Sequence, residues 1–345
     1  MGKKIRIGIN GFGRIGRTVF RSLLDENHSG KLEVVAVNDL GETEALAHLL
    51  EFDSIHGILR KDVSFNDGHI MVNGKSTPHY RVNDPSDIPW AKHDVDVVLE
   101  ATGKFKRKSE AAAHIKAGAK RVIITAVGSG EDIKTIVLGA NDHLLDGTES
   151  VISNASCTTN CAAPLVDVID KNFKIESGYI TTVHSYTSDQ TLHDRPHTDL
   201  RRARAAALSM IPTTTGAAKA ITKIFPHLDG HLGGAGIRVP VPNGSLTDVT
   251  YIVSKKTSVE EVNRQFKMAS ETEPWKDFLG YTEKPIVSSD VMGNTYSCVF
   301  DARLTSVIGN MVKVVGWYDN EMGYSSRLID LAMHWSKFWD SSDKP

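Results

Sequence analysis

A short glycine-rich segment near the start of the sequence, Gly11-Phe12-Gly13-Arg14-Ile15-Gly16, restricts the fold more than any other feature. It follows an alternating apolar run, Lys4–Asn10, and opens a stretch with the apolar spacing of a helix. An acidic residue, Asp39, stands roughly 20 residues further on, after the next apolar run, Leu32–Asn38. In such a strand–turn–helix unit the glycines allow a tight turn, and the helix N-terminus holds the pyrophosphate of a dinucleotide. The sequence therefore predicts an α/β Rossmann unit, in which Asp39 binds ribose hydroxyls and favours NAD over NADP.

The rest of the first half of the chain alternates between strand-like and helical segments. The strand-like runs are short and continuously apolar, as in a parallel sheet that is covered on both faces. A segment with Asn-Asp-Gly and Asn-Gly turn signals, Val63–Val82, predicts an inserted β-meander. We expect a helix at Ser109–Ala117, and strands at Asp94–Ala101, Arg121–Ala126, Ile136–Ala140 and Val151–Ser153.

The second half of the chain shows a different pattern, which predicts an α+β unit with a mostly antiparallel sheet and helices on one face. One segment, Ser188–Ile211, has little apolar periodicity, and an ordered loop of that length is usually functional. We expect helices at about 158–171, 258–270 and 325–339, and long strands at Tyr179–Thr187, Ile237–Ser254 and Ser297–Tyr318. With 345 residues, the chain is long enough for two domains.

The overall charge excludes several classes of partner. Lys and Arg total 40 against 42 Asp and Glu, so no global field favours nucleic acid or an anionic membrane. The sequence contains no apolar run of membrane-spanning length and no signal-peptide pattern. Three cysteines argue against a disulfide framework, and neither they nor the histidines form a metal-binding set. We therefore expect a cytoplasmic protein without a metal.

Cys157 is the candidate nucleophile. It follows small polar residues that can cap a helix, including Ser156, and an apolar run of helical spacing comes after it. A cysteine at a helix N-terminus can have its pKa lowered from ~8.5 to roughly 3.5–7.5, which produces the reactive thiolate. The alternative interpretation of a lone cysteine, a small buried hydrophobic residue, is weaker beside a dinucleotide motif.

Further residues in the second half suit an aldehyde chemistry with anionic ligands. His184 lies in a strand-like run, where it is either a satisfied core residue or the base that a thiol nucleophile requires. Arg238 lies in an apolar run, where a guanidinium needs an anionic partner. Thr213-Thr214-Thr215-Gly216 precedes a helix start that can hold phosphate. The segment Arg201-Arg202-Ala203-Arg204 is either a solvated basic face or another anion site.

Four segments, taken in order, resemble the phosphorylating glyceraldehyde-3-phosphate dehydrogenase family over nearly the whole chain. The second and fourth are the most specific. They are Ile9-Asn10-Gly11-Phe12-Gly13-Arg14-Ile15-Gly16-Arg17, Ala155-Ser156-Cys157-Thr158-Thr159-Asn160-Cys161, Thr213-Thr214-Thr215-Gly216-Ala217-Ala218-Lys219 and Trp317-Tyr318-Asp319-Asn320-Glu321-Met322-Gly323-Tyr324-Ser325.

The resemblance implies a homotetramer that uses NAD, glyceraldehyde 3-phosphate and inorganic phosphate. It implies an NAD-binding domain at 1–156, completed by a C-terminal helix at 320–345, and a catalytic domain at 157–319. Cys157 is then the nucleophile and His184 the base. Further implied cofactor contacts are Gly11, Gly13, Arg14, Ile15, Gly16, Asp39, Thr125 and Asn320. The implied substrate and phosphate contacts are Ser156, Cys157, Thr158, Thr187, Arg202, Thr215, Gly216 and Arg238.

Two departures from the family pattern bear on cofactor choice. Asn83 stands where many members have Lys or Arg near the adenine, and Arg195 stands where Leu or Gly is usual. Erythrose-4-phosphate dehydrogenase, which shares the cysteine–histidine pair, is the nearest alternative, and a non-phosphorylating aldehyde dehydrogenase or an RNA-binding protein is more remote. The resemblance implies phosphorylating oxidation of D-glyceraldehyde 3-phosphate to 1,3-bisphosphoglycerate through a thiohemiacetal and a thioester on Cys157.

Overall fold

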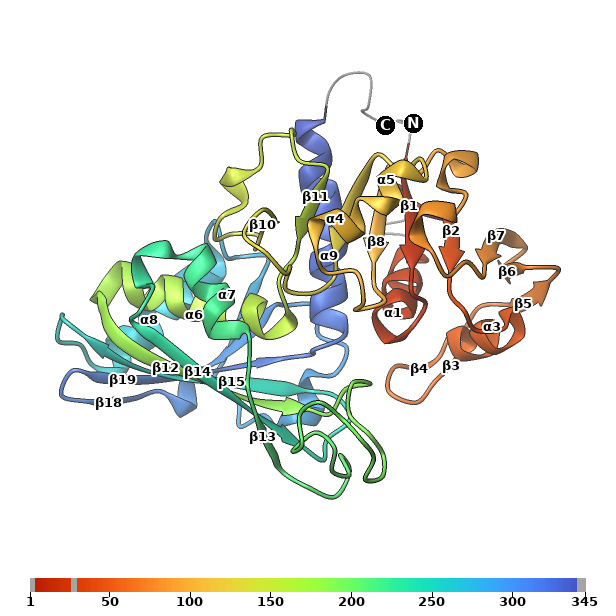
Figure 1. Cartoon of the computed structure of the whole chain (residues 1–345). Helices are drawn as coiled ribbons and strands as arrows, with labels where there is room; N and C mark the ends of the chain where they lie inside the picture. The colour runs from red at the N-terminus through yellow and green to blue at the C-terminus, as the bar shows by residue number, and fades with distance from the viewer. Residues whose placement is uncertain (1–3, 26–29, 340–345) are drawn as a thin grey trace. The chain divides into compact units, whose positions relative to one another are not determined.

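The computed structural model of the chain describes residues 4–25 and 30–339 (Figure 1). These residues form two compact units. The first contains residues up to 136, residues 143–155 and residues from 325 onward, and the second contains 137–142 and 156–324. The predicted NAD-binding part, 1–156 with 320–345, includes residues 1–3 and 340–345, which lie outside the described residues.

The first unit is built on a nine-stranded sheet in the order β10-β11-β9-β8-β1-β2-β7-β6-β5. The strands from β10 to β7 pair in parallel, and β7, β6 and β5 form the antiparallel meander. Both predictions are confirmed. The strands are β1 (Ile5–Asn10), β2 (Leu32–Asn38), β5 (Val63–Asn66), β6 (His69–Val72), β7 (Lys75–Tyr80), β8 (Val97–Glu100), β9 (Arg121–Ile124), β10 (Lys134–Thr135) and β11 (Val151–Ser153), with a separate hairpin of β3 (Phe52–Asp53) and β4 (Gly57–Ile58).

Helices and a C-terminal segment accompany this sheet. The cation–π contacts of Arg121 on β9 join the C-terminal segment to the sheet, since its guanidinium carbon lies 5.9 Å from the Trp335 ring and 4.5 Å from the Trp339 ring. The helices are α1 (Arg14–Leu23), α3 (Thr43–Glu51), α4 (Lys108–Ala111), α5 (Ala113–Lys116) and α9 (Met322–Trp335), of which α9 enters the unit at Ser325.

Two predicted elements of the first half differ from the structure. The helix expected at 109–117 is divided into α4 and α5 by a turn at Ala112. The strand expected at Ile136–Ala140 is absent, and the short strand β10 precedes it. A side chain accepts a backbone hydrogen bond there, because the Val137 N–H donates to Oδ1 of Asn141 at 2.8 Å. Such side-chain acceptors compete with a neighbouring strand for backbone donors, and they favour a turn.

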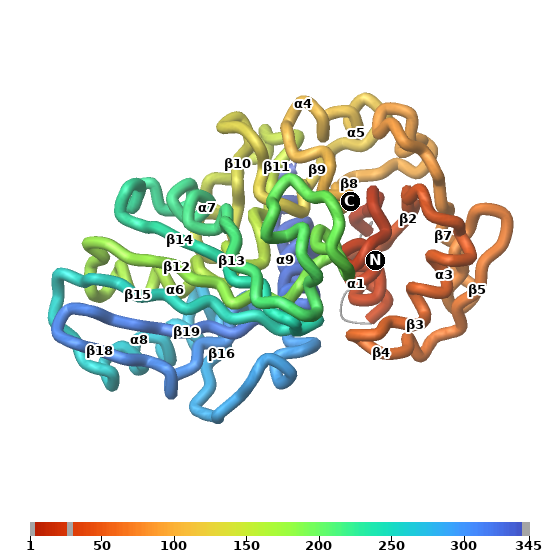
Figure 2. The backbone as a smooth tube through the Cα atoms, turned by 60° about the horizontal axis from the view of Figure 1, so that its bottom comes forward, coloured from red at the N-terminus to blue at the C-terminus, as the bar shows by residue number. Residues whose placement is uncertain are grey.

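The second unit has an eight-stranded, mostly antiparallel sheet in the order β13-β14-β12-β15-β19-β17-β16, with β18 on β19, which confirms the predicted α+β class. Figures 1 and 2 show β14, β12, β15 and β19 side by side. The strands are β12 (Ile175–Ser185), β13 (Ile211–Thr213), β14 (Leu232–Val239), β15 (Ser245–Val253), β16 (Leu279–Thr282), β17 (Cys298–Asp301), β18 (Ser306–Ile308) and β19 (Met311–Tyr318).

Three helices, α6 (Cys157–Phe173), α7 (Ala217–Ile224) and α8 (Val259–Glu271), cover one face of this sheet (Figure 1). The predicted strand at 237–254 is two strands, β14 and β15, because Pro240, Pro242 and Gly244 occupy a turn between them. The parallel pairing of β12 with β14 places His184 opposite Arg238.

Helix α6 packs closely on β19 at Gly316. A Cβ atom added there would lie 2.4 Å from the Cys298 sulfur, 3.2 Å from a Leu165 methyl carbon and 3.4 Å from the Cys161 sulfur. Both cysteines are fully buried. The missing side chain therefore lets the long helix behind the thiol site lie directly on the sheet.

Candidate active site

The start of α6 places Cys157 as predicted, at the first residue of the helix. Ser156 is the N-cap, and its hydroxyl accepts a hydrogen bond from the Thr159 N–H at 3.1 Å. Ala155 has a positive φ of 56°, which turns the chain sharply from β11 into the helix. The hydroxyl of Thr158 lies 3.0 Å from the Tyr318 hydroxyl and is buried. Its side chain is therefore directed into the unit rather than toward a ligand.

The structure brings Cys157 and His184 together, although they are 27 positions apart. The Cys157 sulfur lies 3.4 Å from Nε2 of His184, which is 5% exposed on β12. The other ring nitrogen, Nδ1, lies 2.7 Å from the Ser185 carbonyl oxygen, an acceptor only. This contact assigns the ring hydrogen to Nδ1. The lone pair of Nε2 consequently faces the thiol, as a base requires.

The electrostatics of this pair differ from the sequence expectation. Burial raises the pKa of the Cys157 thiol to about 11, against the opposing effects of the Arg238 charge and of hydrogen bonds from Thr158. Burial and the Arg238 charge lower the pKa of His184 to about 3. Both shifts favour a neutral thiol and a neutral imidazole. Burial therefore opposes the thiolate that the helix N-terminus and the Arg238 charge favour, and the resting thiolate stays a prediction.

Arg238, on β14, contacts the predicted base His184 and also Thr187, which was predicted to bind the substrate or phosphate. Its Nη1 donates to the Ser185 carbonyl oxygen at 3.1 Å and to Oγ1 of Thr187 at 3.0 Å, and it lies 3.1 Å from Nδ1 of His184. No ion pair of Arg238 with a carboxylate is found within residues 4–25 and 30–339. A guanidinium beside the thiol–imidazole pair is suited to an anionic substrate.

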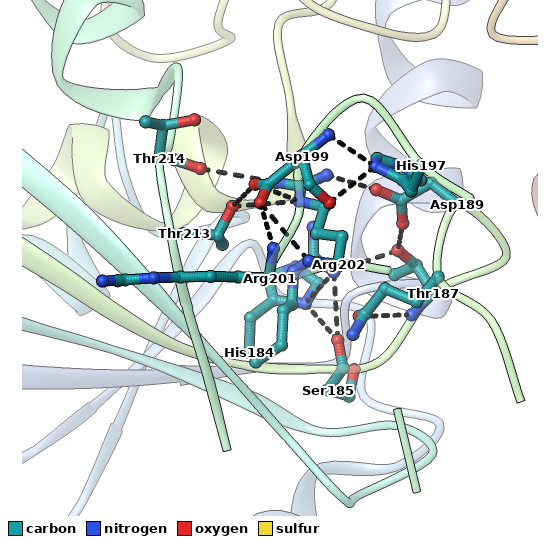
Figure 3. Close-up of polar contacts among 12 residues, drawn as sticks. His184, Ser185, Thr187, Asp189, His197, Asp199, Arg201, Arg202, Thr213 and Thr214 are labelled. Carbon is teal, nitrogen blue, oxygen red and sulfur yellow. Dashed lines mark hydrogen bonds and ion pairs between the residues drawn. The ribbon is translucent and has the colours of Figure 1, made fainter. Parts of the chain in front are cut away.

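Arg202 has a different environment (Figure 3). Its guanidinium forms an ion pair with Asp189, donates from Nε to Oγ1 of Thr213 at 2.9 Å, and lies 3.6 Å from Oδ2 of Asp199. Two carboxylates therefore oppose the positive charge that the resemblance assigned to a ligand site. Asp189 also accepts a hydrogen bond from the Thr187 hydroxyl. These two acids were not predicted. Asp199 stands close to Arg201 and Arg202 in sequence, but Asp189 lies 12 residues before Arg201, and only the folded loop brings it to Arg202.

Thr215 and Gly216 lie at the start of α7, as predicted. Gly216 is the N-cap residue, and the Thr215 hydroxyl accepts a hydrogen bond from the Ala217 N–H at 3.2 Å. A Cβ atom added at Gly216 would meet nothing within 4 Å. Across the part of the chain that the structure describes, no hydrogen bond joins these two residues to Cys157 or Arg238.

Asn320 lies close to the thiol site within the second unit. Its side-chain oxygen accepts hydrogen bonds from the hydroxyls of Ser185 at 2.7 Å and of Ser245 at 2.9 Å. It is 5% exposed. Because two donors fix the oxygen, the amide nitrogen is oriented as a donor away from them. The two serines were not predicted, since nothing in the sequence links residues 185, 245 and 320.

The glycine-rich turn of the first unit has the geometry that a dinucleotide needs. Gly11 has a φ of +93°, and a Cβ atom at Gly16 would lie 2.2 Å from the Gly11 oxygen. Gly13 is the N-cap of α1, where an added Cβ would meet nothing within 4 Å. A helix N-terminus with open space beside it fits a pyrophosphate.

The side chains around this turn are engaged within the unit. Arg14 donates to both carboxylate oxygens of Asp53, at 2.6 and 3.0 Å, so the predicted cofactor contact of Arg14 would use its backbone. Asp39 accepts a hydrogen bond from the Phe12 N–H at 2.7 Å, which holds the acid against the turn. The Thr125 hydroxyl donates to the Glu100 carbonyl oxygen at 3.0 Å at the end of the sheet.

Within the described ranges, no group of three or more His, Cys, Asp or Glu side chains could hold a metal ion. Over the same ranges, no helix is both long and apolar enough to cross a membrane.

The parallel sheet with its glycine turn, together with the thiol–imidazole pair of the second unit, defines the class of NAD-dependent dehydrogenases. Comparison with known proteins is more specific. Residues 5–108 match the family described as glyceraldehyde 3-phosphate dehydrogenase, NAD binding domain, and residues 156–320 match its C-terminal domain. The chain belongs to the glyceraldehyde-3-phosphate dehydrogenase family, and its cofactor is NAD.

Curated relatives of the same family are similar to this chain over nearly its full length. The chain is 53% identical over 331 residues to glyceraldehyde-3-phosphate dehydrogenase 2 of Streptomyces avermitilis, covering 95% of this chain and 98% of the relative. It is 53% identical to the enzyme of Mycobacterium avium (95% and 97%) and 51% identical to glyceraldehyde-3-phosphate dehydrogenase 1 of Bacillus cereus (95% and 98%).

Proposed function

We propose that this chain catalyses the NAD-dependent, phosphorylating oxidation of D-glyceraldehyde 3-phosphate to 1,3-bisphosphoglycerate. The observation that carries the proposal is the 3.4 Å contact between the Cys157 sulfur and Nε2 of His184, next to the guanidinium of Arg238. The match to both domains of the family supports the same activity.

In the first step, the Cys157 sulfur forms a bond to the aldehyde carbon. The thiol proton passes to Nε2 of His184 and then to the carbonyl oxygen, which gives a thiohemiacetal. His184 acts as the general base during the attack, because its Nε2 lies 3.4 Å from the Cys157 sulfur. The backbone N–H of Cys157, at the helix start, and His184 would stabilise the negative charge that develops on the oxygen.

In the second step, Nε2 of His184 takes the hydroxyl proton of the thiohemiacetal. NAD, when bound, accepts the hydride. Inorganic phosphate then attacks the thioester carbon, the C–S bond breaks, and an acyl phosphate leaves. The covalent thioester conserves the oxidation energy that direct hydrolysis would dissipate.

The remaining predicted residues receive roles in this proposal. The glycine-rich turn and the backbone of Arg14 and Ile15 would hold the pyrophosphate. Asp39 would bind the adenosine ribose, and Thr125, which lies at the end of the sheet, would contact the cofactor there. The Asn320 amide would donate to the nicotinamide carboxamide. Arg238 and Thr187 would hold the substrate phosphate. Inorganic phosphate would be held by Ser156, Thr215 and Gly216 through hydroxyl or N–H groups, and by Thr158 through its backbone N–H, since its hydroxyl is buried against Tyr318. Arg202 would contribute positive charge that Asp189 and Asp199 partly offset.

We also propose a homotetramer in the cytoplasm, with residues 1–156 and 320–345 as the NAD-binding part and 157–319 as the catalytic part. Large apolar side chains of the 187–210 segment are strongly exposed, and burial between subunits would remove them from water. They are Leu192, Leu200, Leu208 and Met210. The three free thiols fit a reducing compartment. Light scattering on the purified protein measures the oligomeric state directly.

The test of the function is initial NADH formation with glyceraldehyde 3-phosphate, with and without inorganic phosphate. We expect sustained turnover only with phosphate, because nothing else then releases the acyl group from Cys157. Full-rate turnover without phosphate would indicate a non-phosphorylating enzyme. A clear preference for erythrose 4-phosphate would assign the chain to the alternative dehydrogenase, and tight RNA binding without activity would assign it to a binding protein.

A further inference from the structure

An arginine that was not among the predicted cofactor residues contacts the loop after β2. Arg81, directly after β7, donates from Nε and Nη2 to the Leu40 carbonyl oxygen at 3.3 and 3.2 Å. Its Nη1 donates to Oε2 of Glu42 at 2.7 Å. The two segments are also joined by the Asp39 N–H, which donates to the Tyr80 carbonyl oxygen at 3.0 Å. The guanidinium thus binds the loop on the residues that follow Asp39.

Asp39 itself is fixed in orientation. One carboxylate oxygen accepts the Phe12 N–H at 2.7 Å, and the other accepts the Gly41 N–H at 2.9 Å. These contacts tie the end of β2 to the glycine-rich turn on one side and to the loop on the other. The acid is therefore held where the second strand of a dinucleotide-binding unit meets the adenosine ribose.

The local charge balance is negative. His79 contacts the Asp39 carbonyl oxygen through Nε2 at 3.0 Å and the Thr43 hydroxyl through Nδ1 at 2.9 Å, and burial lowers its pKa, so it adds no charge at neutral pH. The ionised groups on this loop are then two carboxylates, Asp39 and Glu42, against the single guanidinium of Arg81. This balance repels a 2′-phosphate, and Glu42 already occupies one edge of the guanidinium.

We propose that the Arg81 guanidinium can bind the 2′-phosphate of NADP, and that the ion pair with Glu42 prevents this binding. Glu42 is then a specificity-determining residue that acts through Arg81, and the preference for NAD depends on this pair as well as on Asp39. The proposal rests on the adenosine ribose binding beside Asp39, as proposed above.

The test compares binding of adenosine 2′,5′-bisphosphate with binding of 5′-AMP by titration calorimetry at low salt. The proteins are the wild type, Glu42→Gln, Arg81→Ala and the double variant. We expect Glu42→Gln to tighten the bisphosphate about fivefold relative to 5′-AMP, the size of one exposed charge interaction. The double variant is expected to lose this gain. The ratio of kcat/KM for NADP to that for NAD is expected to follow the same order.

Two results would overturn the proposal. One is no gain in Glu42→Gln. The other is an equal gain in the Arg81→Ala background, which would mean that Glu42 acts only by general repulsion. Arg264→Ala is the matched control, because Arg264 is also an exposed arginine paired with a glutamate, Glu261, but on α8. The binding titration does not depend on dehydrogenase activity, so a failure of the proposed reaction would be recognised separately.

Discussion

The nucleotide turn of the first unit and the thiol site of the second unit are built in opposite ways. The turn is made of consecutive residues, and its geometry depends on backbone and on missing side chains at Gly11 and Gly16. The thiol site depends on side chains from α6, β12 and β14, with Cys157, His184 and Arg238 far apart in sequence. We infer that the turn is sensitive to added atoms, whereas the thiol site is sensitive to removed functional groups.

The largest effect is expected from Cys157→Ser. A serine hydroxyl is a far weaker nucleophile than a thiol beside the same base, so kcat should fall by at least about 10⁴-fold. NAD affinity should stay within about twofold if the turn binds it independently, since each such effect is a separate free energy. Stopped-flow NADH formation and NAD titration measure the two quantities. An equal loss of both would mean that Cys157 is structural.

The next largest effect concerns the base. His184→Gln removes the proton acceptor at Nε2 but keeps a similar volume, and we expect kcat to fall about 10³-fold. His231→Gln is a matched control, because His231 is exposed and its ring lies on the surface, with Nδ1 2.7 Å from the Glu176 carbonyl oxygen. Activity of His184→Gln near the wild-type rate would remove the histidine from the mechanism.

The neutral pair can be tested by labelling with iodoacetamide. A thiol whose pKa is raised to about 11 gains thiolate steadily below that pH, so the labelling rate of Cys157 should rise about tenfold per pH unit from about pH 7 to pH 9. Cys161 and Cys298 are fully buried and should remain unlabelled in the folded protein. A rate that is already constant at neutral pH would instead support the resting thiolate.

For the turn, Gly16→Ala is the sharpest probe. Its Cβ atom would lie 2.2 Å from the Gly11 oxygen, so the turn must shift, at a cost of about 2–3 kcal/mol in stability. Gly13→Ala is the matched control, since its Cβ meets no atom within 4 Å. Denaturant unfolding measures both variants. Equal stability of the two would contradict the importance of the close approach at Gly16.

The smallest effect is expected from the ion pair under the turn. Burial raises the pKa of Asp53, but hydrogen bonds from Arg14, His56 and Ile55 outweigh this and lower it to about 2. A lowered carboxyl pKa stabilises the fold above the unfolded value and loses that contribution as the pH falls through about 4 toward 2. Asp53→Asn should cost about 1 kcal/mol near neutral pH, after allowance for solvent screening, and nothing at the acid end. A pH-independent difference in unfolding free energy would refute this.

The sequence predicted most of the first unit because its signals are local. The Gly11–Gly16 turn, the apolar strands and the acid at position 39 each depend on neighbours within a few residues. The errors were also local in cause. Asn141 captures the backbone at Val137, and Ala112 interrupts a helix, both through turn contacts that the apolar pattern does not record.

The thiol site was predictable in its members but not in its electrostatics. Cys157 and His184 were found from residue type and from resemblance, and the structure brings them into contact. Their pKa shifts depend on how much protein surrounds them, which becomes known only from the packed fold. The carboxylates that oppose Arg202 were missed for the same reason, because the loop brings them together through turns without periodicity.

The absence of a side chain at position 316 has a consequence for how related sequences can diverge. The sulfurs of residues 161 and 298 already fill the space in front of that backbone, so the three positions share one fixed volume. An alanine at 316 would force the Cys298 sulfur to move, because the added Cβ atom would lie 2.4 Å from it. We therefore expect substitutions at these positions to be inherited together, as compensating pairs, in members of the family that keep this helix on this sheet.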